Sequence, residues 1–193
     1  MSSINQTLNP IQKSTRRTEK KLATRITLRI PGALYRRIKC DLERPHPFAA
    51  ERIGFLFVRA GSLETNGLLL LGHGYHALAD ERYMDDPEAG ARIDSGAIRE
   101  AMQRVLDGEG GAFHVHLHDH DGRPRYSGMD LSEQPSLIRS FQIAGSTSPH
   151  GTLVLSQNNG IASVWLPGSK EPVNAGRISI VGAPMLMWEG TRK

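Results

Sequence analysis

The pattern of apolar and polar residues along the chain predicts strands that alternate with amphipathic helices. Residues 25–30 alternate apolar and polar side chains, which is typical of a strand. From Leu34 to Leu42 an apolar residue recurs at four-residue spacing, so residues 33–43 are expected to form a helix with one buried face. This order of elements indicates an α/β protein.

Two apolar runs follow the first helix. Residues 53–58 are almost wholly apolar, which is typical of a strand covered on both faces. Residues 67–71 form a second run, and residues 75–78 are expected to continue the same sheet. The acidic segment 83–90 has neither pattern, so we expect it to be a loop.

The second half of the chain repeats the alternation. Asp94 or Ser95 can cap a helix whose apolar residues at 98, 102 and 105 form a buried stripe and which Gly108 ends. A strand from Phe113 follows at once. A further helix is predicted over residues 132–141. Its start is placed late, because Pro135 is tolerated only in the first turn of a helix.

Three short strands are expected to close the fold. Residues 151–156 and 161–166 are apolar runs joined by an Asn-Gly turn, which favours a hairpin, and residues 177–181 are a final strand. The whole pattern predicts a single domain with a mixed β-sheet flanked by helices. We expect this domain at residues 25–183, between a disordered basic tail at 1–24 and a C-terminal tail at 184–193.

Length and composition agree with one domain. The chain has 193 residues, 38% of them hydrophobic, which is enough for one sizeable core. No apolar run approaches the roughly 20 residues of a membrane span, and the N-terminus lacks the apolar core of a secretory signal. Cys40 is the single cysteine, so no intrachain disulfide can form. A cytoplasmic protein without membrane contact is therefore expected.

The positive charge is concentrated at the N-terminus. Residues 1–25 carry six Lys and Arg residues and one acid, Glu19, whereas the rest carries 18 basic and 19 acidic residues. A basic tail can contact nucleic acid. These basic residues are not interleaved with aromatic residues that could stack on bases, so we interpret the tail as solvated and do not expect nucleic-acid binding.

The chemistry of the chain is concentrated in FHVHLHDHDGRPRYSGMD, residues 113–130. Histidines occupy alternate positions 114, 116, 118 and 120. Alternate side chains of a strand point the same way, so the first three would share a face. Imidazoles that converge near a carboxylate can bind Zn²⁺ through nitrogen and oxygen ligands.

The spacing of this stretch resembles the signature of the JAMM/MPN family of zinc metalloproteases. His116-x-His118 is followed, after eight residues, by Ser127-x-x-Asp130, and the family pattern is H-x-H, usually seven residues, then S-x-x-D. The family also has an upstream E-x-x-G-x-L, which Glu51 opens here before an apolar strand. The resemblance spans residues 30–170 and implies a JAMM/MPN-like, cytidine-deaminase-like fold.

The chain departs from the family pattern at two points. The gap is one residue longer than usual, and Asp119 replaces the proline that commonly follows the second histidine. Pairing His118 with His120 would leave a gap of six, and pairing His114 with His116 a gap of ten. We favour His116 and His118, because a one-residue insertion in a loop costs little. Whether His114 or His120 contributes to the metal site stays open.

A bacterial subgroup of the family supports the resemblance. Its members occur beside activating-like and conjugating-like enzymes of ubiquitin-like systems, and they contain H-x-H-x-H followed by G-x-P-x-[FY]-S. The segment from Gly122 to Ser127, GRPRYS, matches that form.

The resemblance implies a zinc-dependent isopeptidase. Its implied metal ligands are His116, His118 and Asp130, with Glu51 as general acid and base and Ser127 as oxyanion donor. The implied substrate is a ubiquitin-like protein cleaved after its C-terminal glycine, for deconjugation or precursor processing. E1-like and E2-like proteins of the same system are further implied partners.

Two alternatives remain at this point. A non-catalytic MPN-like scaffold is one, although inactive relatives typically lack a ligand or the glutamate, and all five positions are filled here. A cupin-like metal enzyme is the other, because His-x-His on a strand also begins the cupin motif. A cupin needs a glutamate shortly after the second histidine, where only Asp119 and Asp121 stand, and the predicted helices are too many for a jelly roll.

Overall fold

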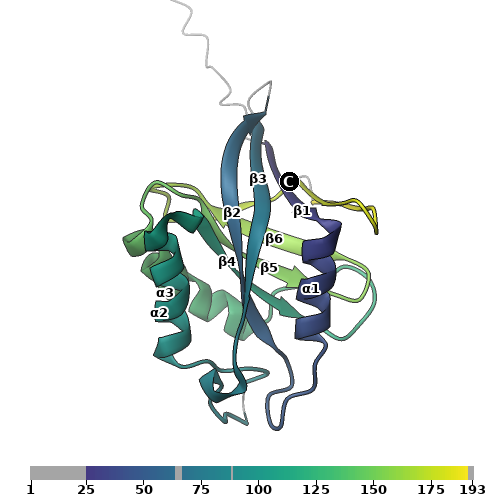
Figure 1. Ribbon diagram of the computed structural model, residues 1–193, viewed down its shortest axis with the longest axis vertical. Helices are drawn as coiled ribbons and strands as arrows, with labels where there is room; N and C mark the ends of the chain where they lie inside the picture. The colour runs from purple at the N-terminus through teal and green to yellow at the C-terminus, as the bar shows by residue number, and fades with distance from the viewer. Residues whose placement is uncertain (1–24, 64–66, 88, 191–193) are drawn as a thin grey trace, which may run out of the picture.

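A nine-stranded mixed β-sheet forms the centre of the molecule (Figure 1). The structure is a computed structural model that describes residues 25–190 except 64–66 and 88, so the tail predicted at residues 1–24 lies outside the described part. The strands lie in the order β7-β6-β5-β4-β2-β3-β1-β8-β9. β1 pairs in parallel with β3 and β8, β4 pairs in parallel with β5, and the other pairs are antiparallel. The prediction of a mixed α/β sheet protein is confirmed.

The strands and helices alternate along the chain much as the hydrophobic pattern predicts. The strands are β1 Arg25–Pro31, β2 Ile53–Leu63, β3 Gly67–Ala77, β4 Gly111–Leu117, β5 His150–Leu155, β6 Gly160–Trp165, β7 Val173–Asn174, β8 Arg177–Val181 and β9 Leu186–Glu189. The helices are α1 Gly32–Leu42, α2 Ser95–Arg104 and α3 Gly128–Ala144, with a 3₁₀ turn η1 Asp80–Arg82 and a π-helical turn η2 Val105–Glu109.

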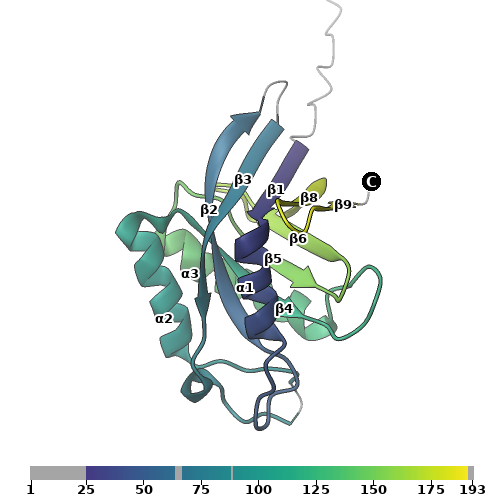
Figure 2. The same cartoon turned by 45° about the vertical axis from the view of Figure 1, so that its right-hand side comes forward.

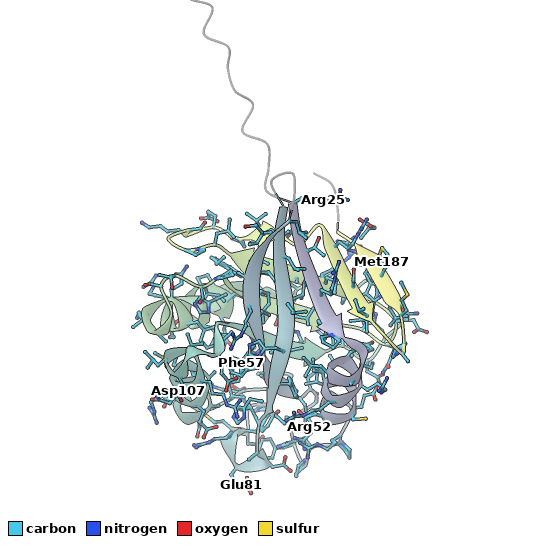
Figure 3. The ribbon with its side chains drawn as sticks, turned by 45° about the horizontal axis from the view of Figure 1, so that its top comes forward. Arg25, Arg52, Phe57, Glu81, Asp107 and Met187 are labelled. Carbon is cyan, nitrogen blue, oxygen red and sulfur yellow. The ribbon has the colours of Figure 1, made fainter. Side chains whose placement is uncertain are left out.

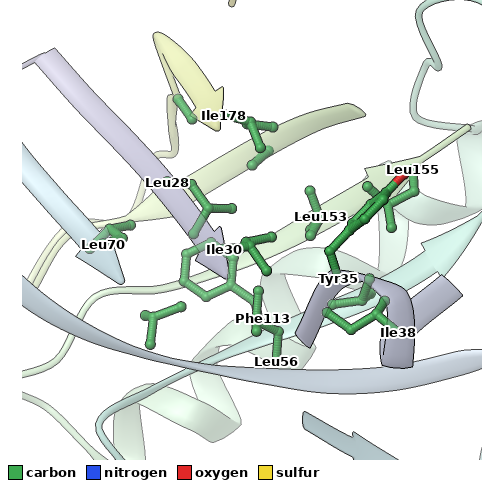
Figure 4. Close-up of a cluster of buried hydrophobic side chains, with 14 of the residues drawn as sticks. Leu28, Ile30, Tyr35, Ile38, Leu56, Leu70, Phe113, Leu153, Leu155 and Ile178 are labelled. Atoms are coloured by element: carbon green, nitrogen blue, oxygen red, sulfur yellow. The ribbon is translucent and has the colours of Figure 1, made fainter. Parts of the chain in front are cut away.

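Helices cover the two faces of the sheet, and each face has its own core. α1 packs on one face, where Tyr35 and Ile38 meet Leu56, Phe113 and neighbouring apolar side chains (Figure 4). α2 and α3 lie together on the other face, over a second cluster that contains Phe55, Phe57 and Phe141 (Figures 1 and 2). β2 contributes to both clusters, as expected of a strand buried on both sides.

The sheet curls so that its two ends approach each other over the α1 side. Trp188 of β9 packs edge-on against Tyr35, with ring centroids 6.0 Å apart. A Cβ atom at Gly160 of β6 would lie only 2.9 Å from the Trp188 ring, so a side chain at this position would displace the indole. Ala175 N–H donates to Ala162 O and Gly176 N–H to Ile26 O, which ties the β7–β8 link to both ends of the sheet.

Two details differ from the predicted elements. α3 begins at Gly128 and contains Pro135 in its interior, so the late start predicted from this proline is wrong. Proline leaves the carbonyl of Leu131 without its helical donor, and Leu131 is exposed, so water can satisfy that carbonyl. Residues 186–189 of the predicted C-terminal tail form β9, which pairs with β8. The sheet therefore continues past residue 183.

No helix within the described ranges has the length and apolar character needed to cross a bilayer.

Candidate metal centre

Three residues from two distant parts of the chain converge at one end of β4. Glu51 lies just before β2, His116 on β4 and His118 just after the end of β4. Their potential ligand atoms all lie within 4.8 Å of one another. His116 Nε2 is 3.2 Å from His118 Nε2, and His118 Nε2 is 3.7 Å from Glu51 Oε1. The antiparallel pairing of Ile53 with His116 explains the meeting, because it brings the start of β2 beside the end of β4.

Asp130 faces the same cluster from the first turn of α3. Its Oδ1 lies 3.5 Å from His116 Nε2, while its Oδ2 accepts a hydrogen bond of 2.7 Å from Ser127 N–H. In return the Ser127 hydroxyl oxygen accepts from Asp130 N–H at 3.0 Å, which completes a capping box. The capping interaction therefore also fixes the carboxylate, with one oxygen held by Ser127 and the other turned toward His116.

Two separations in the cluster are close to those between zinc ligands. Two nitrogen ligands roughly 2.0–2.1 Å from a tetrahedral zinc lie about 3.3–3.4 Å apart. The separations of His116 Nε2 from His118 Nε2 and from Asp130 Oδ1, 3.2 Å and 3.5 Å, are close to this edge length. Within the described residues, the group whose ligand atoms all lie within 4.8 Å of one another is Glu51, His116 and His118, and the predicted ligand Asp130 is not part of it. Four donor groups are thus available: two imidazoles and two carboxylates.

Burial keeps the histidines in the neutral form that binds metals. Removal from water lowers the pKa of His116, an effect that the nearby Asp130 opposes and His118 reinforces. Burial also lowers the pKa of His118. A neutral imidazole has a free lone pair, whereas a protonated one has none. The buried His116 Nδ1 has no hydrogen-bond partner within the described residues, so the polar contacts of this ring are made by Nε2, with His118 and Asp130.

The two carboxyl groups have opposite pKa shifts. Burial and the negative charge of Asp130 raise the pKa of Glu51 to about 7. Burial alone would raise the pKa of Asp130, but the charge of His116 and the hydrogen bonds from Ser127 outweigh burial and lower it. Asp130 is therefore the permanent anion of the cluster, and Glu51 is the carboxyl group that can take up and release a proton near neutral pH.

Glu51 and its neighbour Arg52 are anchored by separate contacts just before β2. Glu51 N–H donates to Gly90 O at 3.0 Å, and a Cβ at Gly90 would lie 3.3 Å from the Glu51 carboxyl carbon. Arg52 is 2% exposed, donates to Arg44 O and Pro45 O, and pairs with Asp80 at 2.8 Å. Figure 3 shows Arg52 at the same end of the molecule as Glu81, opposite Arg25.

The role of Arg52 was not predicted. A charged residue at the entrance of an otherwise apolar run could have indicated this role, because a buried arginine needs polar partners.

Gly54 leaves space at the start of β2 for the side chain of Tyr75. A Cβ at Gly54 would lie 2.0 Å from the Tyr75 hydroxyl oxygen. Tyr75 in turn donates to Asp41 Oδ2 at 2.7 Å, which links β3 to α1. The glycine three residues after Glu51, in the E-x-x-G-x-L segment, is therefore required by packing against Tyr75.

The other histidines of the stretch lie outside the triad. His114 points to the same side of β4 as His116, with ring centroids 5.4 Å apart, and it lines the same cleft. Its pKa is lowered to about 3, mainly by burial. His120 is exposed, and its Nδ1 lies 2.8 Å from Asp121 O. The described geometry thus gathers His116 and His118, the pair that the motif spacing favours.

The cluster lies in a cleft that opens to solvent. The cleft has a volume of about 250 Å³ and is lined by Glu51, the histidines at 114, 116 and 118, Ser127 and Asp130, among others. A neighbouring cavity of about 380 Å³ shares Ile53, His114 and Asp130 with it and adds an apolar wall of Ile93, Ile98 and Leu137. The cavity therefore adjoins the cleft that holds Glu51, His116 and His118.

A scan against models of known protein families and a search of curated proteins both found no match for this chain.

Proposed function

We propose that this chain is a zinc-dependent peptidase with a JAMM/MPN-like fold. It hydrolyses the bond after the C-terminal glycine of a ubiquitin-like protein and so releases a conjugated lysine or a short extension. One observation supports the proposal above all: Glu51, His116 and His118, which match the family motif, have ligand atoms within 4.8 Å of one another, and Asp130 Oδ1 lies 3.5 Å from His116 Nε2. E1-like and E2-like proteins of the same system are the proposed further partners, and the cytoplasm is the proposed location.

In this proposal His116, His118 and Asp130 hold Zn²⁺. Neutral imidazoles and an ionised carboxylate are suitable zinc ligands, and three protein ligands leave a position for water, as in catalytic zinc sites. When bound, the ion supplies Lewis-acid chemistry and lowers the pKa of its water to about 7.

Glu51 performs the proton transfers. Its pKa of about 7 makes it half ionised near neutral pH, so it can accept a proton from the attacking water and return it to the amine that leaves. Its Oε1 lies 3.7 Å from His118 Nε2, beside the cluster and inside the cleft. General acid–base catalysis of this kind typically contributes about 10²–10⁴-fold to the rate.

Ser127 stabilises the oxygen of the scissile carbonyl. Its hydroxyl oxygen accepts from Asp130 N–H, which leaves the hydroxyl hydrogen available as a donor inside the cleft. A donor aimed at a developing oxyanion is typically worth about 10²–10³ in turnover.

The test uses a panel of ubiquitin-like proteins, each extended by a short peptide or joined to a lysine through its C-terminal glycine. We expect Glu51→Gln to retain zinc and to lose about 10²–10⁴-fold in turnover, because the isosteric amide cannot accept the proton. Glu171→Gln, which changes an exposed loop residue, is the matched control and should cleave like the wild type. Equal turnover by Glu51→Gln would remove this residue from the mechanism. No cleavage of any substrate by the zinc-loaded protein would overturn the activity.

A non-catalytic scaffold is the second candidate, and the capping box favours it. Ser127 and Asp130 satisfy each other at the start of α3, so their presence has an explanation without catalysis. Elemental analysis of the purified protein separates the two functions. Zinc bound in a one-to-one ratio and lost on His116→Ala supports the peptidase, and a metal-free folded protein supports the scaffold.

A further inference from the structure

A second cavity lies beside the Ser127 turn and shares no lining residue with the metal cleft. It has a volume of about 310 Å³ and lies between the segment 123–126 and strands β6, β8 and β9, near the first turn of α3. Figure 2 shows these three strands on the side of the molecule away from α2. The cavity exists because the curled sheet brings β9 against β6, as the contact of Trp188 with Gly160 shows.

The wall of this cavity is apolar. Ala162, Ile178 and Trp188 form it from three different strands, and each is less than 10% exposed. Leu131, on the first turn of α3, closes one side and is 58% exposed. The volume and the apolar wall suit one large aliphatic or aromatic side chain, whose burial typically stabilises a complex.

The rim of the cavity is positively charged. Arg123 and Arg125 both line it, and none of its lining residues is acidic. One Arg123 guanidinium nitrogen donates to Glu189 O at 3.2 Å, which holds that side chain at the rim. Arg125 is exposed and has no hydrogen-bond or ion-pair partner within the described ranges. Guanidinium groups bind carboxylates through paired hydrogen bonds, so the rim complements an acidic ligand.

The sheet margin at this cavity is short. β7 pairs with Ser163 and Val164 of β6, so Gly160 and Ile161 lie beyond its end and line the cavity. A protein segment that crosses this margin can place one side chain in the adjoining pocket.

We infer that this cavity is a docking site for a protein segment with one large apolar side chain flanked by carboxylates. The apolar side chain packs against Trp188, Ile178 and Leu131. A flanking carboxylate pairs with Arg125 at the rim. The inference does not depend on the proposed peptidase, because none of these residues lies in the metal cleft.

The test measures binding of a fluorescein-labelled peptide, a central phenylalanine with two acidic residues on each side, by fluorescence anisotropy. We expect saturable binding that Arg125→Glu weakens by about tenfold or more, because a charge-assisted hydrogen bond is lost and repulsion replaces it. Leu131→Asp should weaken binding comparably, and so should serine in place of the peptide's phenylalanine. Arg36→Glu, which reverses an exposed charge on α1 outside the cavity, is the matched control and should leave binding unchanged.

Three results would overturn the inference. One is a lack of saturable binding by the wild type. Another is equal weakening by Arg36→Glu and Arg125→Glu, which would show non-specific charge attraction. The third is competition by N-acetylphenylalanine as strong as that of the peptide, which would assign the cavity to a small carboxylate. Because Arg125 and Leu131 are exposed, both variants should unfold at the temperature of the wild type, which a thermal melt checks.

Discussion

The two faces of β4 are built from alternate residues of one strand, yet they differ in chemistry. Phe113, Val115 and Leu117 point to the α1 side and belong to its apolar core. His114 and His116 point to the opposite side, toward α2 and α3. The first face is explained by packing alone. The second buries polar rings where apolar side chains would fit the fold better, which is expected of a functional site.

The energetic difference between the faces is large. Burial of a large apolar side chain typically contributes about 1.5–3 kcal/mol. A buried polar group without a hydrogen-bond partner, such as His116 Nδ1, costs about 1–3 kcal/mol. The histidine face therefore lowers the stability of the folded protein unless a bound ion offsets the cost.

The largest expected effect is on the apolar face. Phe113 is fully buried, so Phe113→Ala should lower the free energy of unfolding by about 3–5 kcal/mol, through lost burial and a cavity. Urea denaturation with and without a zinc chelator measures the change. The loss should be the same in both conditions, because Phe113 faces away from the metal cluster. A loss seen only with zinc would show that the two faces are coupled.

The next largest expected effect is on the stability that zinc adds through the face of β4 that carries His114 and His116. At a free concentration of 100 times the dissociation constant, zinc should stabilise the wild type by about 2.7 kcal/mol, which calorimetry or denaturation can detect. His116→Leu should abolish this gain. In chelator the same variant should be more stable than the wild type by about 1–3 kcal/mol, because the buried Nδ1 is removed. A less stable variant in chelator would show that His116 supports the fold itself.

The pH dependence of the zinc-free protein should follow from the buried imidazoles. Burial lowers the pKa of His114 to about 3, so below an unfolded-state pKa near 6.5 only the unfolded chain takes up this proton. Stability should therefore be full above pH 6.5 and fall as the pH decreases, by about 1.4 kcal/mol per unit for each such histidine. His114→Leu should reduce this slope between pH 6.5 and 5, whereas the exposed control His73→Ala should not. An unchanged slope in His114→Leu would contradict the assignment.

The smallest expected effect concerns the turn that holds Asp130. Ser127→Ala removes the acceptor for Asp130 N–H and should cost about 1 kcal/mol of stability, as for other helix caps. Ser132→Ala, which changes another exposed serine of α3, is the control, because Ser132 bonds only to the nearby Met129 O. Equal losses of stability in the two variants would show that the Ser127 cap contributes no more to stability than Ser132 does.

Much of the fold could be predicted because local periodicity and burial agree. Residues 53–58 are almost wholly apolar and are buried on both sides of the sheet, as their apolar run predicts. The helices around Ile38 and Ala101 begin and end near their predicted limits. α3 was predicted, but its start was placed four residues too late, because Pro135 was expected to lie in the first turn. β9 was missed because the apolar run at residues 185–188 is only four residues long, and its pairing with β8 defines it as a strand.

The candidate site was predicted in part. The H-x-H and S-x-x-D spacing indicated which residues could meet, since a strand and a helix start have fixed local geometry. The sequence could not show that one oxygen of Asp130 faces His116 while the other accepts from Ser127, or that Arg52 beside Glu51 is buried with partners of its own. These contacts join segments that no local pattern connects. The arginine-lined cavity was not predicted at all, because it forms only where the two ends of the sheet meet.

The contact between Trp188 and Tyr35 sets a practical limit on shortening the protein. A chain ending at residue 183 would lack the indole that covers the α1 side of the core, and Tyr35 and Gly160 would be left open to water. Such a truncated protein is expected to aggregate or to bind hydrophobic dyes, although every residue of the metal cluster would still be present. The minimal folding unit therefore extends at least to Glu189, and a fusion partner is better attached beyond that residue.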